Sequence, residues 1–431
     1  MVFDAAQARR NITIKFVDKD FSKFSVYPVI ASYLIDYLHI DSLFKNVLNL
    51  KNHNLSFSGT EYLLTLLTII FLGIKRIHKA DGLLADECQL AKILGIRKNR
   101  FPNSRGIYRL LSSTNYWSLT RLDKVSFQLI LNHKNLLAEK RWLTIDIDQT
   151  KKITEGRKIE KAKPCYHPGK KGRLGLRISA ATVNGLVFSQ KLEPGNVGNS
   201  NAFPSLLDGT LAKLDIMFPK RQLRDQVKAT CSKRMILRID GGYFSQKTLR
   251  LLEKERAIRN FDFVVRAKNN LKLTQQPRKE RNKDFIKPYK DREIEVLVLP
   301  KQQVLDSVKH KYKVLIIRDK QKRIRSKKKR IYHTKRKVEY LLITTLESWT
   351  TKRIINFYKK RQMIENIFKE QNQSFKANKL PSHKFWGNAF YFQMVSLVAN
   401  ISFFFEAEPA KQKIQERYLR NYPRQIYQFG R

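Results

Sequence analysis

The chain has 431 residues and is therefore long enough for two or three domains. Of these residues 42% are hydrophobic and 29% charged, which is the composition of a folded soluble protein and not of a disordered one. It carries 86 Lys and Arg against 37 Asp and Glu, a formal net charge of +49. This excess goes beyond what solubility requires and indicates a polyanionic partner, most simply nucleic acid, although a generally lysine-rich proteome would account for part of it.

The three widely spaced cysteines argue against a disulfide framework or a zinc site and favour a reducing, cytoplasmic compartment. The N-terminus lacks the apolar segment of a secretory signal.

Residues 1–135 are predicted to form a helical N-terminal region that binds DNA. Residues 27–48 and 61–77 have helix-like apolar spacing and almost no strand alternation. Short helices are expected at 85–96 and 103–113, the second opened by a cap signal at Asn103-Ser104. Small helices rich in Arg and Lys suit DNA docking, although packing explains their apolar residues equally well.

From Trp142 onward the apolar pattern changes to that of strands. The strand candidates are residues 143–147, 175–183, 187–192, 236–239 and 261–265, with helical stretches at 202–218 and 245–258. Strands that come first as a meander and then alternate with helices predict an α/β fold, a mixed sheet flanked by helices.

Residues 271–345 interrupt this pattern and are predicted to form a β-rich basic insertion. Three strand-like runs, at 293–300, 312–319 and 337–345, surround the block "KQKRIRSKKKRIYHTKRK". Such a block is usually a solvated loop or tail, but in a chain this basic a phosphate-contacting role is an equal alternative. On the second reading, DNA binding falls to Arg323, Arg325, Lys327 and Lys328.

The last part of the chain is predicted to hold a long helix, residues 350–375, and an uncharged segment, residues 385–405, that has the length of a membrane span. Polar residues recur through this segment, so we expect a buried helix that packs on the body of the protein, and no membrane partner. The expected organisation is a helical N-terminal region (1–135), a first core part (136–270), the insertion (271–345) and a second core part (346–431).

Two places put acidic residues where a buried strand or its end would normally exclude them. In "RWLTIDIDQTKK", Asp146 and Asp148 sit two apart and therefore point to one face of a strand. In "LRIDGGYFSQ", Asp240 ends a strand, and Gly241 and Gly242 let another group approach the backbone closely.

A third acidic position lies on the predicted long helix. Tyr358, Arg361 and Glu365 stand at i, i+3 and i+7 and share one helical face, whereas Glu370 lies on another face. Taken singly, each of these acidic residues is more often a cap, a turn residue or a surface ion-pair partner.

Taken together, carboxylates from two neighbouring strand ends and one covering helix can hold two divalent cations about 3.5–4 Å apart. Oxygen ligands suit Mg²⁺ or Mn²⁺, which activate a water or a 3′-hydroxyl and stabilise the leaving oxygen of a phosphodiester. Because closely placed carboxylates repel one another without metal, the set makes sense only with cations and a phosphodiester. The sequence therefore predicts two-metal phosphodiester chemistry on nucleic acid.

Several motifs follow one another in a recognisable order: "DIDQT", "YHPGKKGRLGLRIS", "LEPGNVGNSNAF", "LRIDGGYFS" and "YKKRQMIENIFKE". In this order the chain resembles the DDE transposases of bacterial insertion sequences, in the branch whose ribonuclease-H-like core carries a β-strand insertion. The last motif is similar to the family signature Y-x-x-R-x-x-x-E. The resemblance covers roughly residues 60–405.

The resemblance implies a transposase that binds terminal inverted repeats as double-stranded DNA, cleaves phosphodiester bonds there and transfers the 3′ ends into target DNA, as a homodimer associated with the bacterial nucleoid. The implied catalytic residues and ligands of two Mg²⁺ or Mn²⁺ ions are Asp148, Asp240 and Glu365, with Asp146 as an additional metal-ligand candidate. Asp148 is preferred because Thr150 follows it at the family's spacing. The implied DNA contacts include Tyr358 and Arg361.

Two departures from the family pattern stand out. The lysine that the family has seven residues after the glutamate is Asn372 here, which leaves Lys369 as the nearest substitute for a DNA contact. The first acidic motif is followed by "KKITEGRKIEK", which is more basic than usual. Two alternatives stay open: another ribonuclease-H-like DNA nuclease, and a DNA-binding relic without catalysis.

Overall fold

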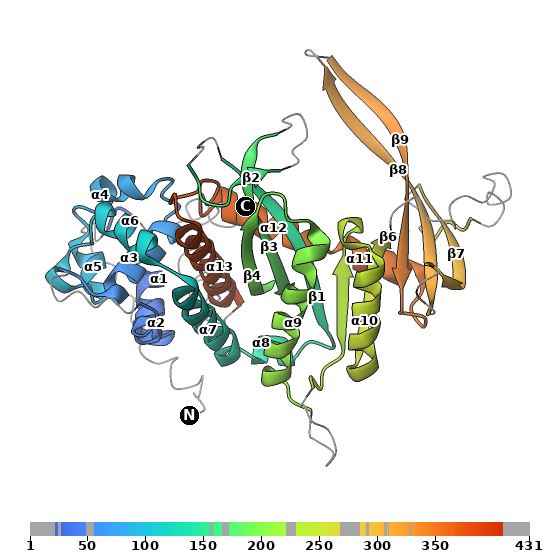
Figure 1. The fold of residues 1–431 in the computed structure, drawn as a ribbon, viewed down its shortest axis with the longest axis horizontal. Helices are drawn as coiled ribbons and strands as arrows, with labels where there is room; N and C mark the ends of the chain where they lie inside the picture. Colours follow the sequence, from blue (N-terminus) through green and yellow to red (C-terminus); the bar gives the residue numbers. More distant parts are fainter. Residues whose placement is uncertain are drawn as a thin grey trace, which may run out of the picture.

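The computed structural model describes residues 22–24, 27–48, 56–154, 156, 158–165, 172–220, 230–267, 285–289, 293–305, 308, 310–327 and 330–407, and for residues 320–327 and 330–338 it describes the backbone alone. The N-terminal helices lie at one end, the main sheet with its covering helices in the middle, and three long strands at the other end (Figure 1). Residues 166–171 of the second motif and Lys328 of the basic block fall outside the described residues.

The predicted helical character of the N-terminal region is confirmed where it is described. Its helices are α1 (Tyr27–Ser32), a π-helical turn (Tyr33–Tyr37), α2 (Ile40–Phe44), α3 (Gly59–Phe71), a 3₁₀ turn (Ile77–Lys79), α4 (Ala80–Leu83), α5 (Cys88–Ile93), a 3₁₀ turn (Arg97–Asn99), α6 (Ser104–Ser113), α7 (Tyr116–Asn132) and α8 (Asn135–Ala138). Asn103 caps α6 as expected, its side chain accepting a hydrogen bond from the Gly106 N–H at 3.0 Å. Helix α3 is apolar on all sides and is buried in the core.

The predicted mixed sheet flanked by helices is also confirmed. Its strands are β1 (Leu143–Ile153), β2 (Lys163–Pro164), β3 (Leu174–Val183), β4 (Leu186–Pro194), β5 (Met235–Ile239) and β6 (Phe261–Ala267), with helices α9 (Asn199–Met217) and α10 (Gln246–Ile258) and a 3₁₀ turn at Gly241–Tyr243. β3 pairs antiparallel with both β4 and β1, and β1, β5 and β6 pair in parallel. The parallel strands bring the carboxyl ends of β5 and β6 to one edge of the sheet.

The predicted end of β1 is wrong. The strand was expected to end at Ile147, but it continues to Ile153 because β3 goes on pairing with it as far as Gly175. Only the parallel pairing with β5 stops at Ile147. Asp148 therefore lies inside the strand, at the point where β1 loses one of its two neighbours.

The insertion continues the main sheet. Strands β7 (Ile294–Gln303), β8 (Lys311–Lys327) and β9 (Arg330–Thr344) confirm the three predicted runs, and β9 pairs antiparallel with β6. For the basic block a solvated loop or tail and a phosphate-contacting role were equal alternatives. Its described backbone is not a loop but forms the outer part of the β8–β9 hairpin, paired from Lys320–Lys337 out to Lys327–Arg330. This hairpin projects well beyond the rest of the sheet (Figure 1).

The predicted long helix is interrupted. It consists of α11 (Thr351–Lys359) and α12 (Gln362–Gln373), separated at Lys360 and Arg361. Bonds of the 3₁₀ type, from the Arg361 N–H to the Tyr358 carbonyl and from the Ile364 N–H to the Arg361 carbonyl, tighten the chain at this junction.

The prediction that the uncharged segment near the C-terminus is a buried helix is confirmed. Helix α13 (Phe385–Ala407) is, among the described residues, the one helix long and apolar enough to cross a membrane, but 78% of its most apolar window is buried inside the protein. Two of its polar side chains face β4: Asn400 exchanges hydrogen bonds with the backbone of Val187, and Ser396 donates to Gln190. Gly387 lets α13 approach α6 closely, because a Cβ there would lie 2.5 Å from the Leu111 carbonyl oxygen.

Candidate active site

Two of the predicted acids are placed side by side by the parallel pairing of β1 and β5. The register aligns Ile147 with Ile239, so Asp148 and Asp240 are the next residues on the two strands. The predicted close approach at the glycines after Asp240 is present: a Cβ on Gly242 would lie 2.7 Å from the side-chain nitrogen of Asn199, at the start of α9. The turn that follows Asp240 is therefore pressed against the helix on one side of the sheet.

Asp146 is bound into a sealed ion pair. Arg238, its neighbour in the register of β5, donates from Nε to Oδ1 at 2.7 Å and from Nη2 to Oδ2 at 2.6 Å. The side chains of Arg238 and Asp146 are 3% and 4% exposed. Arg238 also donates from Nη1 to the Phe357 carbonyl at 2.6 Å, which ties the pair to α11. Both oxygens of Asp146 are thus occupied by a buried arginine.

Asp148, two residues further on, is paired with Arg361 but remains more accessible. Arg361 donates from Nη1 to Asp148 Oδ2 at 3.0 Å and from Nη2 to Glu365 Oε1 at 2.8 Å. The exposed fractions of the Asp148 and Glu365 side chains are 18% and 41%. A single guanidinium therefore joins the predicted first and third acids.

The electrostatics of this group follow from its burial. Burial raises the pKa of Asp148 despite the attraction of Arg361. Burial opposes the charge on Arg361, but Asp148 and its other neighbours outweigh it and hold the pKa of Arg361 above its usual value. Burial therefore disfavours the charged form of Asp148, and the guanidinium of Arg361 offsets part of that effect.

Several buried polar atoms around Asp240 lack a hydrogen-bond partner among the described residues. They are Asp240 Oδ1 and the hydroxyls of Tyr243 and Tyr358. Asp240 Oδ1 lies 3.7 Å from Nη1 of Arg266, a long ion pair whose two side chains are 39% and 40% exposed. Burial, followed by the nearby Asp240, raises the pKa of Tyr358. Unsatisfied buried polar atoms cost stability, and these three lie close to the pair of Asp148 and Arg361.

The donor set fits a hard divalent cation in chemistry, but it is not assembled as a ready metal site. Asp148, Asp240 and Glu365 offer only carboxylate oxygens, as Mg²⁺ and Mn²⁺ prefer. Within the described ranges, however, no three His, Cys, Asp or Glu side chains converge into a group that could hold a metal ion. In this arrangement Arg361 carries the positive charge between Asp148 and Glu365.

The remaining predicted residues lie apart from this group. Lys369 is exposed on α12, and Glu370 is half-buried, its pKa raised by burial and by Glu406. Arg323, Arg325 and Lys327 have their backbone in the projecting part of β8, and their side chains lie outside the description. Sequence reasoning missed Arg238, Arg266 and Tyr243. An arginine inside the apolar strand "MILRI" was the available signal for the first of them.

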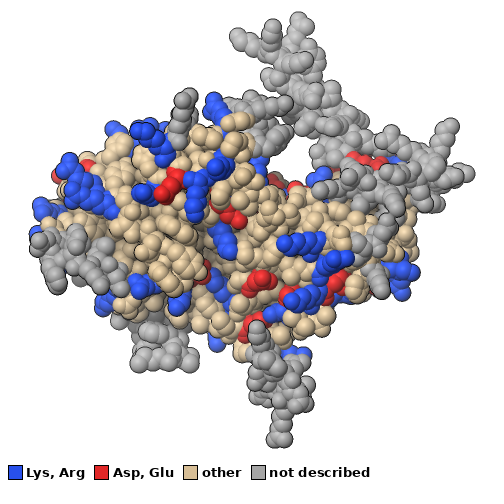
Figure 2. Space-filling view, viewed as in Figure 1, with Lys and Arg blue, Asp and Glu red and all other residues tan. Residues whose placement is uncertain are grey.

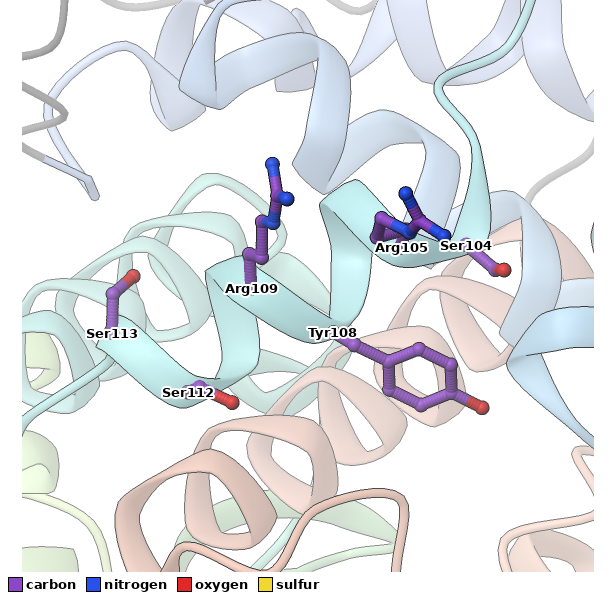
Figure 3. A pocket seen from close by; sticks show the side chains of 6 residues that line it. All are labelled: Ser104, Arg105, Tyr108, Arg109, Ser112 and Ser113. Carbon is purple, nitrogen blue, oxygen red and sulfur yellow. The ribbon is translucent and has the colours of Figure 1, made fainter.

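A second polar and basic surface lies on α6. Its inner side chains, among them Ile107, Leu110 and Leu111, are buried in the core. Its outer side lines an open hollow of about 580 Å³ through Ser104, Arg105, Tyr108, Arg109, Ser112 and Ser113. Arg105 and Arg109 project side by side from the helix, and neither forms an ion pair with a described residue (Figure 3). On the face drawn in Figure 2, Lys and Arg gather over these N-terminal helices while Asp and Glu form small separate patches.

Comparisons with known proteins place the chain in a family. Among solved structures it is similar to a piggyBac transposase synaptic complex with hairpin DNA, determined by cryo-electron microscopy, with 10% sequence identity, a TM-score of 0.47, and coverage of 91% of this chain and 78% of that chain. No curated protein matches. The family model described as "Transposase DDE domain group 1" matches residues 28–420. The chain belongs to this family of DDE transposases.

Proposed function

We propose that this protein is a DNA transposase that binds the terminal inverted repeats of an insertion sequence, cleaves phosphodiester bonds at its ends and transfers the 3′ ends into target DNA. One observation carries this proposal. Asp148 and Asp240 are adjacent across parallel strands, and Arg361 links Asp148 to Glu365 from the helix that covers them. Asp148 thereby stands beside Asp240 in the register of the two strands and is joined to Glu365 by one guanidinium.

In the proposed mechanism, Asp148, Asp240 and Glu365 would hold two Mg²⁺ or Mn²⁺ ions, which would activate the attacking oxygen and stabilise the leaving oxygen of the phosphodiester. The hydroxyls of Tyr243 and Tyr358 are buried close to these acids and would reach a phosphate only if the site opens. Arg361 lies between Asp148 and Glu365, and its guanidinium would donate to a phosphate oxygen of the bound DNA.

The proposed DNA contacts lie on two surfaces outside this site. The α6 surface offers two guanidinium groups, on Arg105 and Arg109, as donors for phosphate oxygens, whereas the hydroxyls of Ser104 and Ser113 already donate to Asp81 and to the Leu110 carbonyl. The β8–β9 hairpin is a two-stranded ribbon, a shape that the DNA major groove accepts, and its described backbone carries the predicted positions Arg323, Arg325 and Lys327. Synapsis of two DNA ends calls for two copies, so we propose a homodimer in the active complex.

The decisive experiment is Mg²⁺-dependent nicking of DNA that carries the sequences flanking this reading frame. Glu365→Gln is expected to abolish nicking while DNA binding and the fold survive, because it removes one carboxylate and little else. The matched control is Glu370→Gln, the same change on α12 away from Arg361, which should nick normally. Normal nicking by Glu365→Gln contradicts the assignment.

The same assay separates the two alternatives. A ribonuclease-H-like nuclease of another kind would nick but would produce no joined 3′ ends when target DNA is supplied. A relic that only binds DNA would bind the flanking sequence and show no nicking with Mg²⁺ or Mn²⁺. The proposed transposase gives both nicked and joined products.

A further inference from the structure

Lys152 is a buried lysine that the proposed chemistry does not use. It lies on β1, four residues after Asp148 and on the same face of the strand, and is 5% exposed. Its Nζ donates to the side-chain oxygen of Asn372 and to the Ala377 carbonyl oxygen, the latter at 2.5 Å, and lies 5.1 Å from the centre of the Phe392 ring. Among the described residues no carboxylate pairs with it.

Keeping an amine in this position is costly. Burial lowers the pKa of Lys152 to about 8, which means that the folded protein disfavours its charged form. An apolar side chain would fill the same space without that cost. The amine must therefore be retained for its contacts, and both of its hydrogen bonds go to α12 or to the residues just after it.

Lys152 and Asn372 form a second connection between the two elements that carry the first and third acids. The first connection runs from Asp148 through Arg361 to Glu365. Along β1, Asp148 and Lys152 are about 13 Å apart, at roughly 3.3 Å per residue. The two contacts on the α12 side are made by Arg361 and Asn372, which are about 16–17 Å apart at 1.5 Å per residue. Two contacts that occur in the same order along both elements fix the direction of α12 on β1 as well as its distance.

We propose that Lys152 is a positioning residue, which holds α12 in register with β1 through Asn372 and so keeps Glu365 within reach of the cations bound by Asp148. This inference rests on the proposed function. In this chain the amine of the contact comes from β1 and the amide from α12. Swapping residues 152 and 372 would therefore exchange the two members of the contact.

The exchange can be tested with a cycle of four proteins: wild type, Lys152→Asn, Asn372→Lys and the double exchange. Lys152→Asn leaves two amides too short to meet, and Asn372→Lys brings two buried amines together. Each single variant is expected to nick 10- to 100-fold more slowly than wild type and to need more Mg²⁺ for half-maximal activity, with unchanged affinity for repeat DNA. The double exchange restores one amine and one amide, and should recover nicking to within about threefold of wild type.

A second readout does not depend on nicking. The rise in melting temperature on adding Mg²⁺ should be smaller in each single variant and return in the double exchange. If Lys152→Asn keeps the wild-type nicking rate and Mg²⁺ response, or if the double exchange is no better than the single variants, the inference is wrong. If wild type never nicks repeat DNA but the Mg²⁺ response follows the cycle, the proposed function fails and the positioning role stands.

Discussion

Asp146 and Asp148 share one face of one strand, and each pairs with an arginine, yet the two ion pairs are built for different purposes. The Asp146–Arg238 pair is almost completely buried and satisfies both oxygens of the carboxylate. The Asp148–Arg361 pair uses one oxygen of Asp148, shares its arginine with Glu365 and stays partly open to solvent. Two arginine–carboxylate pairs, two residues apart on one strand, therefore differ in role. The Asp146–Arg238 pair holds the fold, whereas the Asp148–Arg361 pair can exchange its partner.

The difference lies in what each arginine can do when a competing ligand arrives. Arg238 is also bonded to the Phe357 carbonyl and has no open path to solvent. Arg361 sits at the junction between α11 and α12, where the chain is already irregular. Arg361 is the more exposed of the two arginines, which supports the proposal of Asp148 as the first catalytic acid.

The largest expected effect comes from removing the carboxylate of the Asp148–Arg361 pair. Asp148→Asn should reduce the nicking rate by about four orders of magnitude, which corresponds to about 5.5 kcal/mol, because it removes a proposed cation ligand. The free energy of unfolding should fall less than for Asp146→Asn, because Asp148 is 18% exposed and Arg361 keeps Glu365 as a partner. Nicking kinetics measure the first effect, and urea denaturation of the same preparation measures the free energy of unfolding.

The sealed pair should respond in the opposite way. Asp146→Asn is expected to lower the free energy of unfolding by about 3–5 kcal/mol, because it leaves Arg238 as an uncompensated buried charge. Replacing both residues, as Asp146→Leu with Arg238→Met, should cost less than Asp146→Asn alone. Urea denaturation of the single and double variants measures this. A single variant as stable as wild type would show that the pair does not hold the sheet.

Much of this fold follows from local sequence pattern. The strand at residues 235–239 and the helix at 246–258 were predictable because continuous apolar runs and helical spacing are local signals. The burial of α13 was predictable from its recurring polar residues, which pair with β4. The length of β1 was not, since it depends on β3 pairing beyond Ile147. Nor was the interruption at Arg361, where tertiary contacts with the acids override helical continuity.

The sequence indicated which acids to compare, but not the cations that pair with them. The resemblance pointed to Asp148, Asp240 and Glu365 together, and that assignment stays a prediction. Arg238 and Lys152 find their partners through strand register and helix placement, which no single motif encodes. The sequence left Asp146 as a further candidate because its partner Arg238 lies 92 residues away.

An intermediate effect is expected at Arg361, and it depends on metal. Arg361→Ala should destabilise the metal-free protein by about 1–2 kcal/mol, because Asp148 and Glu365 lose the cation between them. Mg²⁺ should then stabilise this variant more than it stabilises wild type, since the ion no longer competes with a guanidinium. Thermal denaturation in EDTA and in Mg²⁺ makes the comparison. An equal Mg²⁺ response in both proteins would mean that Arg361 and the cations do not share a place.

The smallest effect on stability is expected at the third arginine–carboxylate pair, Asp240–Arg266, which extends the comparison to an exposed site. Its atoms are 3.7 Å apart and both side chains are about 40% exposed, so solvent already screens the charges. Arg266→Ala should change the free energy of unfolding by less than about 0.5 kcal/mol, measured by urea denaturation. Asp146, Asp148 and Asp240 would then rank by burial, although all three pair with arginine. A loss above about 2 kcal/mol at Arg266 would break that ranking and would mean that Asp240, like Asp146, is held for the fold.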